Sequence, residues 1–556
     1  MAFPHEDNLP KSSCSDQNRA KTAAPEGPAV DDARSALDVG KVLTPQEVEN
    51  INDKSFLQAL KTWPFAALWS MVLSSTMIMV AYGPAWIAQL FALPAFTMRF
   101  GFEYDGVYTI SAGWQSTLSA CSMVGQIIGA TSIAILMDKY GRKPSFIFAL
   151  FLISGCEFVQ FFSTSLTVLL VGTILVGVSL GCFGVLCLTY AMEVVPLRLR
   201  GALGGLYSLG IITGPLLSAA VAQAVVNMTS VWAYRIGYAV HWVWPVVLLP
   251  LSIFLPESPV WLTRRGRLAE AEAALARLAI TGYDVGPDLA RMVAVDQQEL
   301  LYAQSTSYIE IFKGVNRRRT VIACVCYATI ALTGNTLVNS GAYFLILAGI
   351  DANTSFYWAL GSALLALIGA FCGLYILAAW DRRPVYIWSQ AIGGLVLILV
   401  GFVQLEASYW ERVNGPFGQA ALFAAWNFVY GAFIGPISTV IMGEVPNNAL
   451  RPKTVAFATM VQVVLVVLTL VINPYLMNPG FAFLQGYIGF IAGAIGMLCT
   501  IWIYFYVPET ALTIERLELL FEAEIDARHF RSYDVAQLDG PDAVPAGHEA
   551  DMKCKA

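Results

Sequence analysis

Long, continuously apolar runs divide this sequence from end to end. Twelve of them have about 20 residues each, the length that crosses the hydrocarbon core of a bilayer as an α-helix. They lie near residues 65–87, 112–135, 145–163, 167–189, 202–225, 235–255, 320–342, 356–379, 385–404, 417–440, 454–473 and 486–507. The runs lack the alternation of membrane strands, so they predict helices rather than a barrel. We expect an all-α integral membrane protein with twelve transmembrane helices.

Composition and motifs exclude several other classes of protein. Charged residues make up 13% of the 556 residues, against roughly 25% in soluble proteins. A net charge of −6 argues against binding to the negatively charged backbone of nucleic acid. No P-loop, G-x-S-x-G, H-E-x-x-H or C-x-x-C motif occurs, so the sequence offers no sign of an enzyme, a metal site, a cofactor or an ATP-driven pump.

Basic residues predict the orientation in the membrane. Twelve spans place both termini on one side, and only Arg99, Arg235 and Arg412 of the 33 Lys and Arg residues lie on the other side. Positive charge collects on the cytoplasmic side. We therefore expect cytoplasmic termini in a multi-pass protein, and we expect its bilayer to be the plasma membrane.

Three motifs recur in the same order in the two halves of the chain. MDKYGRKPSF is followed later by AWDRRPVYIW, EVVPLRLRG by EVPNNALRP, and LPESPVW by VPETALT. The offsets of the paired residues are 243, 251 and 252 for Asp138 and Asp381, Glu193 and Glu444, and Pro256 and Pro508. The chain is therefore predicted to contain two six-helix halves in parallel repeat, as in secondary transporters.

The repeat predicts how the chain is divided. The halves are residues 64–255 and 320–507, joined by a cytoplasmic linker, 256–319, that contains amphipathic helices. In LAEAEAALARLAI, Leu268, Ala271, Leu275 and Leu278 form one apolar stripe. Residues 1–63 are expected to be a mostly disordered tail, and residues 508–556 a second cytoplasmic tail.

These motifs resemble the sugar-porter branch of the major facilitator superfamily. Within that branch, FALPAF, WAYRIGYAVHWVWP and VINPYLMNP are most similar to fungal maltose (α-glucoside) permeases. The resemblance implies that the two halves alternate access to a central site for a small-molecule solute, often together with protons. We expect a monomer to be the functional unit.

Charged residues at the cytoplasmic helix ends are candidates for a gate. Opposite charges at facing helix ends can pair when the inner side closes and separate when it opens; alternatively, they only anchor the helix ends. The candidates are Asp138, Arg142, Glu193, Arg200, Asp381, Arg382, Glu444 and Arg451.

The binding site departs from the pattern that the resemblance implies. The glutamine usual in span 5 is Ser208, the amide pair before the glycine of span 7 is Ile330 and Ala331, and the tryptophan of span 10 is Thr439. Amides and hydroxyls that remain in the spans can pair with a hydroxyl-rich solute, or they can instead bond between helices. The candidate solute ligands are Asn335, Asn339, Gln462, Tyr82, Asn427, Thr439 and Ser208.

Proton coupling cannot follow the route that the resemblance implies. The aspartate that many symporters of this branch carry in span 1 is Gly83, and the arginine often found in span 4 is Thr173. Glu157 and His241 are the strongly titratable residues left inside the spans, and an ionisable group at membrane depth is a functional candidate. The alternatives are a neutral carboxyl near the outer end of span 3 and a neutral, hydrogen-bonded imidazole. The sequence favours facilitated diffusion or coupling that depends on His241.

Three functions compete at this point. The first is uptake of a sugar or glucoside, the second is export of a fungal secondary metabolite by the same fold, and the third is a nutrient sensor that transports nothing. The tail of 46 residues after Thr510 is too ordinary to favour the sensor. Sequons at Asn227 and Asn353 on predicted outer loops are candidate glycosylation sites.

Overall fold

The computed structural model describes residues 56–104, 106–305, 307–406, 414–447, 450–512, 514–523 and 525–531. The predicted disordered tail, apart from its last residues, and the end of the C-terminal tail lie outside these ranges. Eleven helices in the described part of the chain are long and apolar enough to cross a membrane. This is the helical membrane fold that the sequence predicts.

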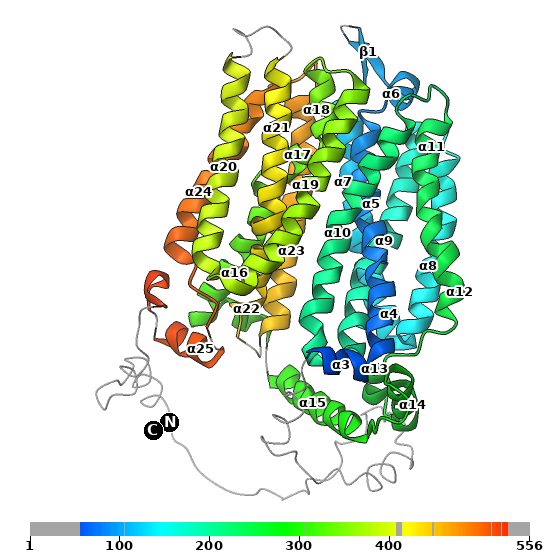
Figure 1. Cartoon of the computed structure of the whole chain (residues 1–556), viewed down its shortest axis with the longest axis vertical. Helices are drawn as coiled ribbons and strands as arrows, with labels where there is room; N and C mark the ends of the chain where they lie inside the picture. The colour runs from blue at the N-terminus through cyan, green and yellow to red at the C-terminus, as the bar shows by residue number, and fades with distance from the viewer. Residues whose placement is uncertain are drawn as a thin grey trace, which may run out of the picture. The chain divides into compact units, whose positions relative to one another are not determined.

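The first half runs from α3 to α12 (Figure 1). Span 1 is α4 followed by α5, and spans 2 to 5 are single helices. The elements are α3 (Phe56–Thr62), α4 (Pro64–Ser74), α5 (Thr76–Leu90), α6 (Pro94–Phe100), the antiparallel strands β1 (Phe102–Tyr104) and β2 (Val107–Thr109), α7 (Ala112–Tyr140), α8 (Arg142–Phe161), α9 (Leu166–Val194) and α10 (Leu197–Val225).

Span 6 is not one regular helix. It consists of α11 (Trp232–Ala239), the 3₁₀ turn η1 (Val240–Trp242) and α12 (Val243–Ser252). Pro245 has no N–H to bond to the carbonyl of His241, so the regular ladder is interrupted at this turn. The three pieces together complete a sixth crossing that no single long helix provides.

The linker and the second half follow. Span 7 is split into α16, α17 and α18, and span 10 runs from α21 through a π-helical turn into α22. The elements are α13 (Pro259–Arg264), α14 (Leu268–Leu278), α15 (Gly286–Ser305), η2 (Tyr308–Phe312), α16 (Gly314–Leu332), α17 (Asn335–Asn339), α18 (Gly341–Leu347), α19 (Ala352–Ala379), α20 (Arg382–Glu406), α21 (Asn414–Val429), η3 (Tyr430–Ile434), α22 (Gly435–Glu444), α23 (Arg451–Met477), η4 (Gln485–Tyr487), α24 (Ile488–Tyr506), α25 (Ile514–Glu522) and η5 (Ala527–His529).

Glycines allow equivalent helix pairs to pack closely in the two halves. A Cβ added at Gly129 of α7 would lie 1.9 Å from the carbonyl oxygen of Val178 in α9. A Cβ added at Gly373 of α19 would lie 2.0 Å from the carbonyl oxygen of Ala432 in η3. Small residues at such crossings let backbones approach in a membrane, where dispersion contacts replace the hydrophobic effect.

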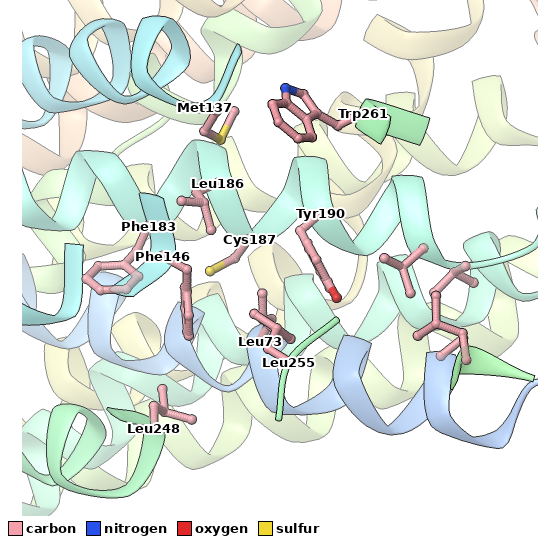
Figure 2. Close-up of a cluster of buried hydrophobic side chains, with 14 of the residues drawn as sticks. Leu73, Met137, Phe146, Phe183, Leu186, Cys187, Tyr190, Leu248, Leu255 and Trp261 are labelled. Carbon is pink, nitrogen blue, oxygen red and sulfur yellow. The ribbon is translucent and has the colours of Figure 1, made fainter. Parts of the chain in front are cut away.

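The start of the linker is part of the core of the first half. Figure 2 shows the buried cluster that includes Phe146, Phe183 and Tyr190, together with Trp261 of α13. The Tyr190 hydroxyl donates to the carbonyl of Pro256 at 2.8 Å, and Trp261 Nε1 donates to the carbonyl of Asp138 at 3.0 Å. The linker therefore begins as a fixed part of the first half.

Candidate functional site

A cavity of about 230 Å³ lies between the two halves. The first half contributes residues of α5, α7 and α10, and the second half contributes residues of α17, α18, α19, α21 and α23. A solute in this cavity would touch both halves at once, which is the position that alternating access requires.

Helix irregularities surround the cavity because proline and glycine interrupt its walls. Pro84 in α5, Pro215 in α10 and Pro474 in α23 all line it, and each removes one backbone hydrogen bond from its helix. Gly334 separates α16 from α17 with φ +92°, and a Cβ there would lie 2.7 Å from Leu397 Cδ1. The left-handed φ favours glycine at this break, which turns α17 toward the cavity.

The lining is rich in side-chain amides, with hydroxyls and aromatic rings between them. Each amide can both donate and accept, which suits a solute with many hydroxyl groups. The amides are Gln89, Gln115, Asn335, Asn339, Asn427 and Asn473. The hydroxyls are Ser119, Ser122, Thr336, Ser340, Ser362 and Tyr343, and the other aromatic residues are Phe91, Trp358 and Phe423.

Two pairs among these residues are already hydrogen-bonded. Asn339 Nδ2 donates to Asn335 Oδ1 at 3.1 Å, and Asn427 Nδ2 donates to Ser362 Oγ at 2.6 Å. Each bond fixes the orientation of an amide and leaves further donor and acceptor positions for a solute. Asn335, Asn339 and Asn427 are thus three predicted ligands that the structure brings together.

The other four predicted ligands do not line the cavity. Tyr82 is buried on the opposite face of α5 and donates to the carbonyl of Gly237 at 2.7 Å. Gln462 and Ser208 precede the lining residues of α23 and α10 by one and two helical turns, toward the linker end. Thr439 is exposed on α22 and donates to the carbonyl of Gly435 at 2.9 Å.

The sequence analysis did not identify Gln89, Gln115 and Asn473 as solute ligands, although each is an amide in or beside an apolar run. Asn473 directly precedes the proline inside α23, and Gln89 follows the proline of α5 by five residues. Amides close to a proline inside an apolar run were the signal that could have identified these two residues. Gln115 carries no such signal.

Hydrogen bonds between the halves close the cavity at the end opposite the linker, which we call the outer end. The Tyr343 hydroxyl shares a hydrogen bond with Thr109 at 2.8 Å and accepts one from Gln115 Nε2 at 3.0 Å. Asn478 Nδ2 and Gln115 Nε2 both donate to the carbonyl of Ile110, at 2.7 and 2.8 Å. Thr109 ends β2, Gln115 lies in the first turn of α7, and Asn478 directly follows α23, so these bonds hold the two halves together on that side.

The charged motifs form two equivalent networks at the linker end. Arg142 makes a two-pronged contact with Glu193 at 2.6 and 2.9 Å, and Glu257 accepts from the backbone N–H of Arg142 at 2.8 Å. In the second half, Arg382 contacts Glu444 at 2.5 Å, and Glu509 accepts from the backbone N–H of Arg382 at 3.1 Å. Both ion pairs lie within one half rather than between the halves.

The remaining gate candidates have separate positions. Asp138 is 3.5 Å from Arg142, whereas Asp381 pairs with Arg531 of the C-terminal segment. Arg200 is in α10, but its side chain lies outside what the structure describes. Arg451 begins α23, and its buried Nε has no hydrogen-bond partner among the residues that the structure describes.

Both sequons and both proton candidates lie apart from the cavity. Asn227 is exposed after α10, whereas Asn353 is half-buried and accepts from Gln223 Nε2 at 2.7 Å. Glu157 and His241 are buried together in the first half, with 3.1 Å between Oε2 and Nδ1.

Comparisons with known proteins agree with this geometry. Residues 69–521 match the family described as "Sugar (and other) transporter". The general alpha-glucoside permease of Saccharomyces cerevisiae is 30% identical over 496 residues, which cover 87% of this chain and 80% of the permease. The maltose permease MAL31 of the same yeast is 29% identical over 504 residues, 88% of this chain and 81% of that protein.

Solved structures share the fold. The xylose transporter XylE from E. coli, in a partially occluded inward-open conformation, has a TM-score of 0.64 at 19% identity, over 81% of this chain and 99% of XylE. An auto-inhibited POT family peptide transporter has a TM-score of 0.54 at 13% identity, over 79% of this chain and 96% of that one. The predicted major facilitator fold of two six-helix halves is confirmed, and the chain belongs to the sugar (and other) transporter family.

Proposed function

We propose that this transporter moves an α-glucoside such as maltose into the cell, through the plasma membrane and with both termini in the cytoplasm. The amide-lined cavity between the halves carries the proposal. The 30% identity to yeast alpha-glucoside permeases over most of the chain supports the class of solute. The solute crosses the membrane without covalent change. Because one chain encloses the whole cavity, a monomer in the bilayer is sufficient for transport.

The lining suits a sugar in two ways. Its amides can pair with hydroxyl groups on several sides, and a sugar also presents C–H faces that pack on rings such as Trp358 and Phe423. The volume of about 230 Å³ is below the roughly 300–1,000 Å³ of typical ligand pockets. We therefore expect a disaccharide to enlarge the cavity when it binds, as the halves separate.

Uptake of labelled maltose tests the proposal in cells that lack their own α-glucoside transporter. Asn335→Ala and Asn427→Ala each remove hydrogen bonds worth about 0.5–1.5 kcal/mol, so KM should rise roughly 2- to 13-fold. The control is Asn227→Ala, an exposed asparagine outside the cavity, with rates normalised to surface abundance. No transport of any α-glucoside by the wild type, or unchanged KM in both cavity variants, would refute the proposal.

A further inference from the structure

Two ionisable side chains face each other inside the apolar first half. His241 Nδ1 of η1 lies 3.1 Å from Glu157 Oε2 of α8, and their side chains are 2% and 0% exposed. Neither belongs to the charge networks at the linker end, and neither lines the cavity. Burying such a pair costs several kcal/mol per ion unless its contacts compensate, so its presence calls for a role.

Among the described residues, the groups around the pair do not carry a compensating charge. The Tyr82 ring of α5 meets the His241 ring edge-on at 5.0 Å. The hydroxyl of the buried Tyr238 in α11 has no hydrogen-bond partner in the described part of the chain. The thiols on this side of α8 and α9 are Cys156 and Cys182, both buried. Phenols and thiols are ordinarily neutral near pH 7.

The cation of α11 is engaged elsewhere. The Arg235 guanidinium lies over the Phe161 ring at 5.7 Å, one turn beyond Glu157 on α8. Within the described residues, Arg235 makes no ion pair with Glu157. The histidine is therefore the basic group in contact with this carboxyl.

Charge balance makes the pair a site for one proton. With a carboxylate and a neutral imidazole, the pair carries one negative charge in an apolar interior. One added proton makes it neutral, whether that proton resides on the carboxyl or on the ring. A second proton would leave a net positive charge. A buried net charge is costly, and the form with one proton is the one that leaves the buried pair without net charge.

Only one helix separates the pair from the cavity. Ala81, Pro84 and Ala85 of α5 line the cavity, while Tyr82 and Gly83 face the pair. A Cβ added at Gly83 would lie 3.4 Å from His241 Nε2. A movement of α5 when solute binds would therefore change the surroundings of the imidazole directly.

We propose that Glu157 and His241 form the proton-binding site of this transporter, which makes it a proton–solute symporter. The pair takes one proton from the outer solution when the outer end is open. It carries that proton as a neutral unit while it is buried as seen here, and releases it to the inner solution when the linker end opens. One proton and one solute move in the same direction. This inference rests on the proposed sugar transport.

Two measurements in proteoliposomes separate coupling from transport. Counterflow of maltose at equal pH needs only the solute site, whereas accumulation against a maltose gradient needs the proton. Wild type should accumulate maltose about tenfold per unit of pH difference, because one unit is worth about 1.36 kcal/mol. Glu157→Gln should retain counterflow and lose accumulation, because it removes the carboxylate whose negative charge the proton balances.

His241→Gln is the second variant, and it should move the pH at which accumulation is half-maximal. The matched controls are Glu103→Gln, on the outer hairpin, and His529→Gln, in the segment after α25; both should accumulate maltose like wild type. A purely structural pair would lower counterflow and accumulation together. Full accumulation in Glu157→Gln, or counterflow without accumulation in wild type, would overturn the inference.

A solute-free readout keeps the two proposals distinct. Infrared difference spectra of the purified protein between high and low pH should show a protonated carboxyl band or an imidazolium band. Glu157→Gln should remove the carboxyl band, and His241→Gln should remove the imidazolium band. Absence of both bands in wild type would overturn the proton site whatever the solute is. Absence of maltose counterflow in wild type, with these bands present, would refute the sugar instead.

Discussion

Replacing Tyr343 by phenylalanine should open the outer end of the transporter. The hydroxyl bonds to Thr109 and Gln115, and so joins the second half to the first. Phenylalanine keeps the ring and removes both bonds in the closed form only. Two hydrogen bonds at about 0.5–1.5 kcal/mol each give about 1–3 kcal/mol, which shifts the balance of open and closed forms by roughly 5- to 150-fold.

Thiol labelling measures this shift without any solute. Ser119→Cys places a thiol in the cavity wall, and a reagent that cannot cross the membrane is added from outside. The labelling rate should rise with the population of the outward-open form. The same chain without Ser119→Cys gives the background from the native cysteines, and Tyr357→Phe, at an exposed position on α19, is the matched control. A labelling rate equal to that of the Ser119→Cys parent would refute the assignment of this hydroxyl to outer closure.

Three further outcomes are expected. Gly129→Ala should lower the thermal unfolding temperature strongly, because the added Cβ would lie 1.9 Å from a backbone atom of α9. Gly155→Ala, where a Cβ would have nothing within 4 Å, should leave that temperature unchanged. Equal unfolding temperatures of the two variants would contradict the close-packing argument. Glu444→Ala leaves its arginine partner without a counter-charge, so transport should fall much more than surface abundance, and parallel losses would point to misfolding alone. We expect a glycan on the exposed Asn227 and none on the half-buried Asn353. Enzymatic removal of the glycan should change the gel mobility of the protein only while Asn227 is present. A glycan on Asn353 alone would show that the outer loops are arranged differently.

The sequence predicts the helices and the repeat well because both depend on local patterns. Continuous apolarity is sufficient to mark a crossing, and the repeated motifs place Arg142 and Arg382 in equivalent networks. The repeat is not copied residue for residue, however. Asp381 pairs with Arg531 of the C-terminal segment, a partner far along the chain that no local spacing indicates.

The solute site was harder to predict, because helical periodicity indicates which face of a helix a residue lies on but not how far along the membrane normal the cavity extends. Gln462 precedes the lining residue Val466 by one turn, and Ser208 precedes Pro215 by two turns, so each is on the expected face at another level. Where a cavity ends depends on which end of the bundle is closed, and that is a property of contacts between the halves. The approach of Glu157 to His241 likewise depends on how two helices pack.

The carboxylates of Glu257 and Glu509 have a consequence for how the chain is assembled. Each accepts backbone N–H groups at the first turn of the third helix in its own half, α8 or α20, where the helix dipole favours negative charge. In each half, the segment that follows the sixth span is thus hydrogen-bonded to the third span of the same half. A chain severed between α15 and α16 should therefore yield two fragments that each fold and then recombine in one bilayer into a working carrier.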